Sequence, residues 1–184
     1  MNRCAWVNLK NPLYIAYHDH EWGVPLHEDR SLFELLILET FQAGLSWECV
    51  LNKREAFRRA YDGFDVEKVA AYDEEKQREL LENPAIIRNR LKIKASIHNS
   101  DIFRRIQMEF GSFDAYLWGF TGGKSISEPY ALQPTSPLSD TISADLKKRG
   151  MKFVGSTVIQ AFLQATGVLN AHGPECDHCA AARP

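Results

Sequence analysis

The chain has 184 residues, of which 45% are hydrophobic and 25% charged, as in a folded globular protein and unlike a disordered chain. This length suggests one domain or two closely joined lobes, and no apolar run approaches the ~20 residues that cross a bilayer. The net charge of −2 argues against a general nucleic-acid coat, although a local basic face remains open.

The first residues and the cysteines indicate the compartment. The N-terminus lacks the basic and then apolar pattern of a secretion signal. The cysteines are too few for a disulfide scaffold in a chain of this length; they are Cys4, Cys49, Cys176 and Cys179. We therefore expect a cytoplasmic protein without a membrane partner, in a reducing compartment where clustered Cys and His more often bind metal.

The first strong helix signal begins at Ser31. Ser31 and Glu34 have the S-x-x-E spacing of a capping box, in which each side chain satisfies a backbone amide at the helix start. Residues 32–39 are apolar on almost every side, which is typical of a buried helix. Glu39 is therefore expected near the interior, at the far end of this helix.

A short break at residues 43–45 follows this helix. Ser46 is a favoured N-cap residue, and we expect the next helix over residues 47–61 with a stop at Gly63. Asp65 and Asp73 are expected to cap two shorter helices, the second of which ends at Pro84.

The second half of the chain also has a helical pattern. Residues 86–110 predict one long helix ended by Gly111, residues 121–137 a loop, and residues 139–149 and 156–167 two further helices. Two groups of cations are candidates for a basic face: Arg88, Arg90, Lys92 and Lys94, and then Lys147, Lys148, Arg149 and Lys152. Each group alone is more often a solvated helix face. No strand alternation, repeat or long linker is present, so the expected fold class is all-α.

Cysteine and histidine residues near the two ends of the chain predict a metal site. Cys4 and His18 lie in the first twenty residues, and His172 and Cys176 have H-x3-C spacing near the other end. Cys and neutral His are the preferred tetrahedral ligands of zinc, so a structural ion here would join the two ends. Three nearby residues leave the ligand set open: His20, His178 and Cys179.

Three other groups of residues have chemical potential. Residues 39–47 combine an acid expected to be buried, Glu39, with a Gly44-Leu45 tip and the aromatic Trp47. Residues 150–156 form a glycine-bounded connection between helices, where backbone amides and Lys152 are suited to a DNA phosphate. The third group consists of aromatics suited to a planar ring, Trp6, Tyr14, Tyr17 and Trp22. Taken singly, each group is more often ordinary core or an ordinary turn.

Together these segments resemble the 3-methyladenine DNA glycosylase I family. The matching blocks are residues 3–7, 11–19, 21–25, 33–34, 42–47, 86–88 and 146–155. They follow one another from Arg3 to about Cys176, nearly the whole chain. The resemblance implies a helix-hairpin-helix DNA glycosylase fold with a zinc site joining the N- and C-terminal segments. It also implies a single domain, 1–184, with two lobes, residues 31–115 and residues 1–30 plus 116–184.

The same resemblance implies an activity and its partners. The enzyme would flip 3-methyladenine out of double-stranded DNA and hydrolyse its N-glycosidic bond in base excision repair, acting as a monomer. Enzymes of the wider superfamily place a catalytic aspartate after the hairpin, yet residues 157–171 contain no Asp or Glu. That absence fits the 3-methyladenine branch and leaves the water-activating group unidentified. No nucleophilic lysine is present there either, so no strand cleavage is expected.

The resemblance assigns roles to individual residues. It places the base between Trp47, Tyr14, Trp6 and Trp22, with Glu39 and Tyr17 as the catalytic pair and Glu39 also binding the base. DNA would be bound through Gly44, Leu45, Lys152, Gly155 and Ser156. Structural Zn²⁺ would be held by Cys4, His18, His172 and Cys176. A second hypothesis is a zinc-containing module that recognises DNA damage without cutting it.

Overall fold

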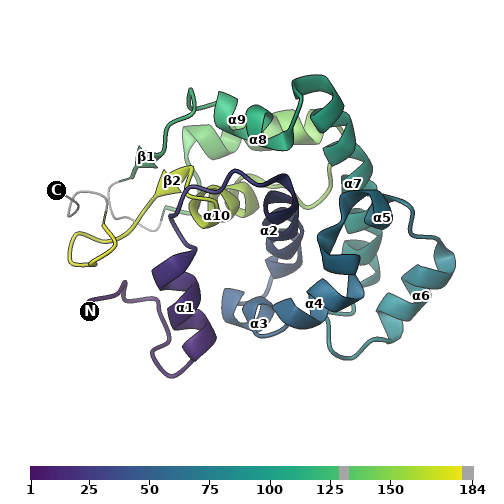
Figure 1. Ribbon diagram of the computed structural model, residues 1–184, viewed down its shortest axis with the longest axis horizontal. Coiled ribbons are helices and arrows are strands. Elements are labelled where there is room, and N and C mark those ends of the chain that lie inside the picture. The colour runs from purple at the N-terminus through teal and green to yellow at the C-terminus, as the bar shows by residue number, and fades with distance from the viewer. Residues whose placement is uncertain (129–132, 180–184) are drawn as a thin grey trace.

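The structure is a computed structural model, and it describes residues 1–128 and 133–179. Helices make up most of it, which confirms the all-α expectation (Figure 1). The helices of the first half are α1 (Pro12–His20), α2 (Asp29–Gln42), α3 (Trp47–Leu51), α4 (Arg54–Ala60), the 3₁₀ turn η1 (Asp62–Phe64), α5 (Val66–Ala70) and α6 (Glu74–Glu82). The remaining elements are α7 (Arg90–Phe110), α8 (Phe113–Gly119), β1 (Ile126–Ser127), α9 (Pro137–Lys148), α10 (Ser156–Ala165) and β2 (Leu169–Asn170). No described helix is long and apolar enough to cross a membrane.

Helix α2 forms the centre of the molecule and packs against α3, α7, α8 and α10 (Figure 1). Its residues from Leu32 to Phe41 are all buried, as the apolar run predicts. The predicted capping box is wrong, because the N-cap is Glu28, whose carboxylate accepts from the amides of Arg30 and Ser31. Glu34 accepts instead from Arg54.

The helix predicted over residues 47–61 is two helices, α3 and α4. Asn52 and Lys53 interrupt it, and the Asn52 side chain accepts a hydrogen bond from Asn11, the N-cap of α1. The caps Ser46, Asp65 and Asp73 are confirmed. Helix α7 begins four residues later than predicted, at Arg90, because Asn89 caps it.

The predicted loop over residues 121–137 contains a strand that the pattern did not predict, and its residues 129–132 lie outside the described part. Strand β1 pairs in parallel with β2, with Ile126 opposite Leu169. This pairing attaches the loop to the segment that follows α10. The predicted helices around residues 139–149 and 156–167 correspond to α9 and α10.

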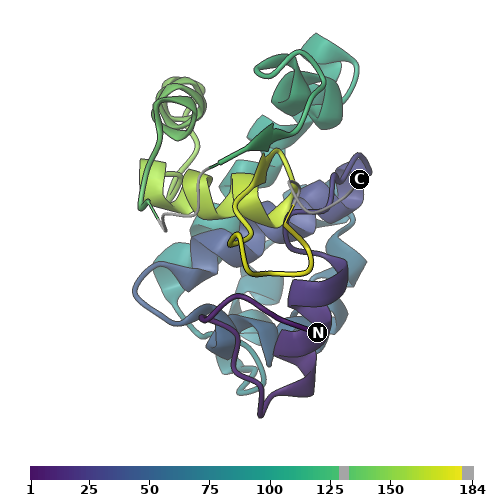
Figure 2. The same ribbon diagram turned by 90° about the vertical axis from the view of Figure 1, so that its left-hand side faces the viewer.

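The two ends of the described chain lie side by side (Figures 1 and 2). The amide of Asp177 donates to the carbonyl of Asn2 at 3.0 Å, and the amide of Asn2 donates to the Asp177 carboxylate at 2.9 Å. The stretch after α1 packs on the end of α10, where a Cβ on Gly167 would lie 2.3 Å from the carbonyl carbon of Val24. Such a contact excludes any side chain at Gly167, which also has φ +68°.

Candidate functional site

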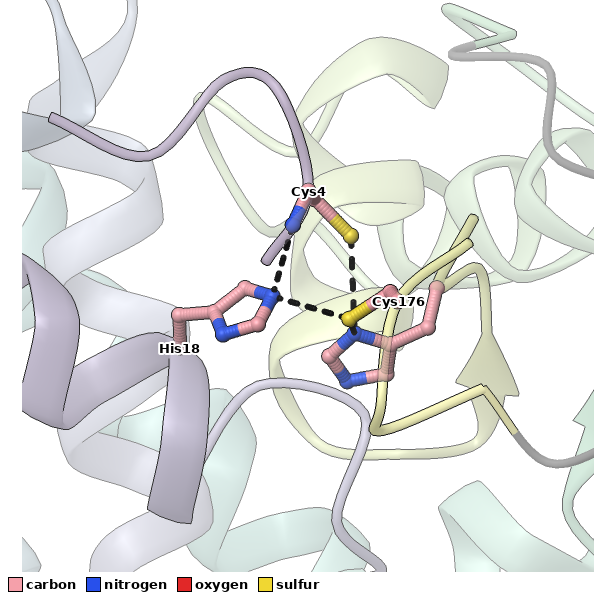
Figure 3. Close-up of side chains that lie close together, drawn as sticks. Cys4, His18 and Cys176 are labelled. Carbon is pink, nitrogen blue, oxygen red and sulfur yellow. Dashed lines mark hydrogen bonds between the residues drawn. The ribbon is translucent and has the colours of Figure 1, made fainter. Parts of the chain in front are cut away.

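The two ends of the chain bring four buried ligand residues together. The ligand atoms of Cys4, His18, His172 and Cys176 lie within 4.8 Å of one another. Cys4, His18 and Cys176 point toward a common centre in Figure 3. All four cysteines of the chain are free thiols. The predicted ligand set is therefore assembled as a buried cluster that can hold a metal ion.

Distances within the cluster fit a tetrahedral zinc ion. The Nδ1 atom of His172 lies 3.6 Å from Sγ of Cys4 and 3.4 Å from Sγ of Cys176. Nε2 of His18 lies 3.5 Å from Sγ of Cys176. Zn–S bonds of about 2.3 Å and Zn–N bonds of about 2.0 Å at a tetrahedral angle put S and N about 3.5 Å apart.

Outer hydrogen bonds orient both imidazoles for this role. Nδ1 of His18 lies 2.8 Å from the carboxylate of Asp19, which also accepts from Arg3. Nε2 of His172 lies 3.0 Å from the carbonyl of Trp22. Each ring can thus donate its outer N–H and turn its other nitrogen to the centre, as metal-binding histidines do. The Arg3 guanidinium holds the pKa of Asp19 below its usual range, so this outer partner stays anionic.

The competing ligands are not members of the four-residue cluster. His178 groups with His18 and Asp19 and lies 3.6 Å from the Asp19 carboxylate. His20 is exposed on the outer side of α1, and Cys179 is buried but absent from the cluster. The geometry therefore favours the set of Cys4, His18, His172 and Cys176 over sets that include His20, His178 or Cys179.

The ligand histidines pack directly on the N-terminal aromatics. The rings of Trp22 and His172 are 4.6 Å apart, and those of Trp6 and His18 are 5.3 Å apart. Trp6 and Trp22 contact each other edge to face at 4.8 Å. The Cys/His cluster and the aromatic segment are consequently one packed unit.

A cavity of about 150 Å³ lies on the other side of these rings. Its lining includes the predicted aromatics and the predicted acid, together with three residues that were not predicted: Trp6, Tyr14, Tyr17, Trp22, Glu39, Gln42, Trp47, Ala161 and Gln164. The rings of Tyr17 and Trp47 lie 5.2 Å apart. Residues from α1, α2, α3 and α10 therefore meet around one slot.

Glu39 contributes the carboxyl group of this slot. Its side chain is 2% exposed, and its Oε2 atom has no hydrogen-bond partner among the described residues. Burial raises the pKa of Glu39 to about 8, so the carboxyl is mostly protonated at neutral pH. Burial also raises the pKa of Tyr17, and its phenol remains neutral. Two indole N–H groups, of Trp6 and Trp47, are buried without an acceptor in the described chain.

The three lining residues that sequence reasoning missed come from α2 and α10. Gln42 ends α2, and Ala161 and Gln164 lie on one face of α10. The amide of Gln164 donates to Glu128 at 3.4 Å, and that of Gln160 donates to the same carboxylate at 3.0 Å. The i, i+3 spacing of Ala161 and Gln164 places them on one face of α10, but nothing in the neighbouring sequence indicates which residues that face packs against.

The Gly44-Leu45 tip is a tight turn beside the cavity. The amide of Leu45 donates to the carbonyl of Gln42 at 2.6 Å, Ala43 has φ −47° and ψ 113°, and Gly44 has φ +83°. These values are typical of a type II turn, which requires a residue that tolerates positive φ, such as Gly44. Leu45 is 42% exposed, so its side chain is available to a partner.

The connection between α9 and α10 has an open helix start. Gly155 is the N-cap of α10 and offers no side chain, so the first-turn amides, including that of Ser156, have no side-chain acceptor among the described residues. The Asn99 side chain bonds both the amide of Lys152 at 2.8 Å and its carbonyl at 2.9 Å. Phe153 at the tip has φ +56°, a strained value for a bulky residue.

Only some of the cations in the two candidate basic faces are exposed to solvent, where DNA could reach them. Lys147, Lys148 and Lys152 are exposed beside the connection, whereas Arg149 pairs with Asp145 and Glu109. In the first group Arg88, Arg90 and Lys94 are exposed. Lys92 is 6% exposed, so its placement on a solvated basic face is wrong.

The chain is similar to known proteins over nearly its whole length. Residues 6–180 match the model of the methyladenine glycosylase family. DNA-3-methyladenine glycosylase 1 of Escherichia coli strain K12 is 44% identical over 180 residues, which cover 96% of each chain. DNA-3-methyladenine glycosylase of Haemophilus influenzae is 35% identical over 95% of this chain and 96% of its own. A solved structure of 3-methyladenine DNA glycosylase I from Staphylococcus aureus, concerned with 3-methyladenine recognition, has a TM-score of 0.90 and 37% identity over 96% of this chain and 95% of that one.

Proposed function

The chain belongs to the methyladenine glycosylase family, and we propose that it excises 3-methyladenine from alkylated double-stranded DNA in base excision repair. The observation that carries this proposal is the cavity in which Tyr17 and Trp47 meet the buried carboxyl of Glu39. The names of the curated relatives support the same reaction.

The substrate itself lowers the demand on catalysis. Methylation at N3 gives the adenine ring a positive charge, so its bond to the sugar is already weak. When the bond between C1′ and N9 breaks, its electron pair leaves with the base, which becomes neutral. Water then adds to the oxocarbenium-like C1′ and loses its proton to solvent. Little protonation of the leaving group is needed, and because residues 157–171 contain no lysine that could attack the sugar, we expect the DNA strand to stay intact.

The aromatic walls recognise the cationic ring. Trp47 stacks on the extruded base, and Tyr14, Trp6 and Trp22 complete the walls of the slot. A cation over an aromatic face gains roughly 0.5–2 kcal/mol, most when water is excluded. A neutral adenine gains less from the same walls, so the cavity favours the methylated base.

Glu39 and Tyr17 are the proposed catalytic pair. A cation entering the cavity opposes the desolvation that keeps Glu39 protonated, so it favours the carboxylate. The carboxylate then accepts from the exocyclic amino group of the base and stabilises the developing sugar cation at low dielectric. Tyr17 stays a neutral phenol and is available as a hydrogen-bond donor.

DNA binding is assigned to the turn and the connection. Leu45, on the Gly44 turn, fills the gap left by the extruded nucleotide, whose extrusion costs a few kcal/mol and least for a damaged base. The connection acts as the hairpin of a helix-hairpin-helix element: Lys152 and the amides around Gly155 and Ser156 bind a backbone phosphate.

The metal and the organisation of the molecule complete the proposal. Cys4, His18, His172 and Cys176 hold Zn²⁺, whose chemistry here is a structural cross-link of the two ends. The protein is a cytoplasmic monomer and one domain, 1–184, with lobes of residues 31–115 and of residues 1–30 plus 116–184.

The decisive experiment measures release of free 3-methyladenine from methylated duplex DNA by chromatography. We expect the wild type to release the base and to leave strands that break only on later alkaline treatment. Trp47→Ala should lose about 10-fold or more in rate, since one stacking contact contributes up to ~2 kcal/mol, whereas Trp47→Phe retains a ring and most of the rate. DNA binding by the wild type without release would instead favour a module that recognises damage without cutting.

A further inference from the structure

Lys92 is a lysine in an unusual place. It lies in the first turn of α7 with 6% of its surface exposed, and its ammonium donates to the carbonyl of Phe41 at 2.7 Å and to that of Ala43 at 2.6 Å. Burial lowers the pKa of this ammonium. Removing a lysine from water is costly, and no carboxylate of the described residues pairs with Lys92. The two hydrogen bonds to carbonyls must therefore offset the cost of burying its charge.

Both carbonyls belong to the end of α2 and to the turn that follows it. The last carbonyls of a helix have no partner within the helix, and a cation there also interacts favourably with the helix dipole. Phe41 precedes Gln42, whose own carbonyl closes the turn to Leu45 at 2.6 Å. The ammonium thus holds the backbone on both sides of Gln42, which itself lines the cavity.

The same helix also fixes the connection before α10. Asn99 lies about two turns beyond Lys92 on α7, a distance of about 10 Å, and grips both polar backbone groups of Lys152. His98 lies 3.1 Å from the carbonyl of Gly150. One rigid element therefore anchors the Leu45 turn and the phosphate-binding connection, and so sets the spacing between them.

We propose that Lys92 is a positioning residue for excision from duplex DNA. Its side chain holds the Gly44-Leu45 turn in the conformation with which Leu45 enters the DNA double helix beside the extruded nucleotide. This role rests on the proposed function. Lys92 touches neither base nor phosphate and acts through the carbonyls of Phe41 and Ala43.

The test compares Lys92→Met with Lys92→Arg and with Lys68→Met, which removes an exposed lysine of α5. Single-turnover release from methylated duplex DNA should fall roughly 10- to 100-fold in Lys92→Met, because small misplacements are costly in catalysis. Lys92→Arg should recover part of the rate, and Lys68→Met should match the wild type. Affinity for free 3-methyladenine, followed by tryptophan fluorescence, should stay within about 2-fold of the wild type in every variant, since Lys92 and Lys68 do not line the cavity.

Hydrogen exchange of the free protein tests the same role without a substrate. The amide of Leu45 should exchange faster in Lys92→Met but not in Lys68→Met. An unchanged exchange rate, or an equal loss of base affinity and duplex excision, would overturn the positioning role. Absence of base release by the wild type would overturn the proposed function instead, while the exchange measurement would still decide whether Lys92 holds the turn.

Discussion

Glu39 shows how burial alone sets the protonation of a side chain in this cavity. The pKa of its carboxyl is about 8 in the folded protein against an ordinary value of 4.5. Between pH 4.5 and about pH 8, Glu39 is ionised in the unfolded chain but still protonated in the folded chain. The free energy of unfolding therefore falls as the pH rises through this range. Above about pH 8 both states are ionised and the loss levels off.

Glu39→Gln should remove this pH dependence. Between about pH 5 and 8, the unfolding free energy of the wild type should fall relative to the variant by about 1.4 kcal/mol per pH unit. Urea unfolding of both proteins across this range measures the slope. Glu82→Gln, at the exposed end of α6, is the matched control and should follow the wild type. Parallel curves for Glu39→Gln and the wild type would contradict the raised pKa.

Leu45, in the turn after α2, is proposed to act as a wedge that fills the gap left in the DNA by the extruded nucleotide. Leu45→Ala should slow excision from duplex DNA about 10-fold while leaving the affinity for free 3-methyladenine unchanged, because Leu45 does not line the cavity and is proposed to meet DNA. Leu45 is 42% exposed, so the unfolding free energy should change by less than about 0.5 kcal/mol. Leu9→Ala removes an equally apolar, 65% exposed side chain and should leave both measurements unchanged. Equal losses in excision and base binding would refute the wedge.

Helices were predictable from sequence where the signal is local. The apolar run of α2 and the caps Asp65 and Asp73 depend only on neighbouring residues. The start of α2 was mispredicted because Glu28, not a usual N-cap residue, accepts the first amides. The break at Asn52 depends on contacts with a residue about forty positions away, Asn11.

The site was predictable to a similar extent. The ligands and the aromatics stand out by residue type, and a family resemblance assigns them roles. Lys92 does not stand out, since a lysine among other cations indicates a solvated face, and its carbonyl partners lie about fifty residues earlier. Gln164 was missed for the same reason: its partner Glu128 comes from the loop that β1 and β2 attach. Contacts between residues so far apart in the sequence produce no periodic pattern, so they cannot be predicted from the sequence.

The Cys/His cluster joins the two terminal segments of the described chain, and removal of the proposed metal tests whether that metal stabilises the fold. Cys4→Ala, or extraction of the metal by a chelator, should lower the unfolding free energy by about 3 kcal/mol or more, roughly 10 °C in Tm, because metal-binding energy is folding energy at a structural site. Trp6 and Trp22 should become exposed, with a red-shifted emission, since His18 and His172 no longer hold them. Cys49→Ala, outside the cluster, is the control. Equal stability and activity of the metal-free protein would rule out the structural role.

The packing of His172 against Trp22 bears on how the protein is made. Two of the four residues of the Cys/His cluster are synthesised long after Trp6 and Trp22, the rings that pack against the cluster's histidines. The chain must therefore be synthesised almost to Cys176 before the four side chains of the cluster can meet. A product that ends before His172 would lack two of the four residues of the cluster and the ring that packs on Trp22, so we expect such a product to leave this wall of the cavity unsupported.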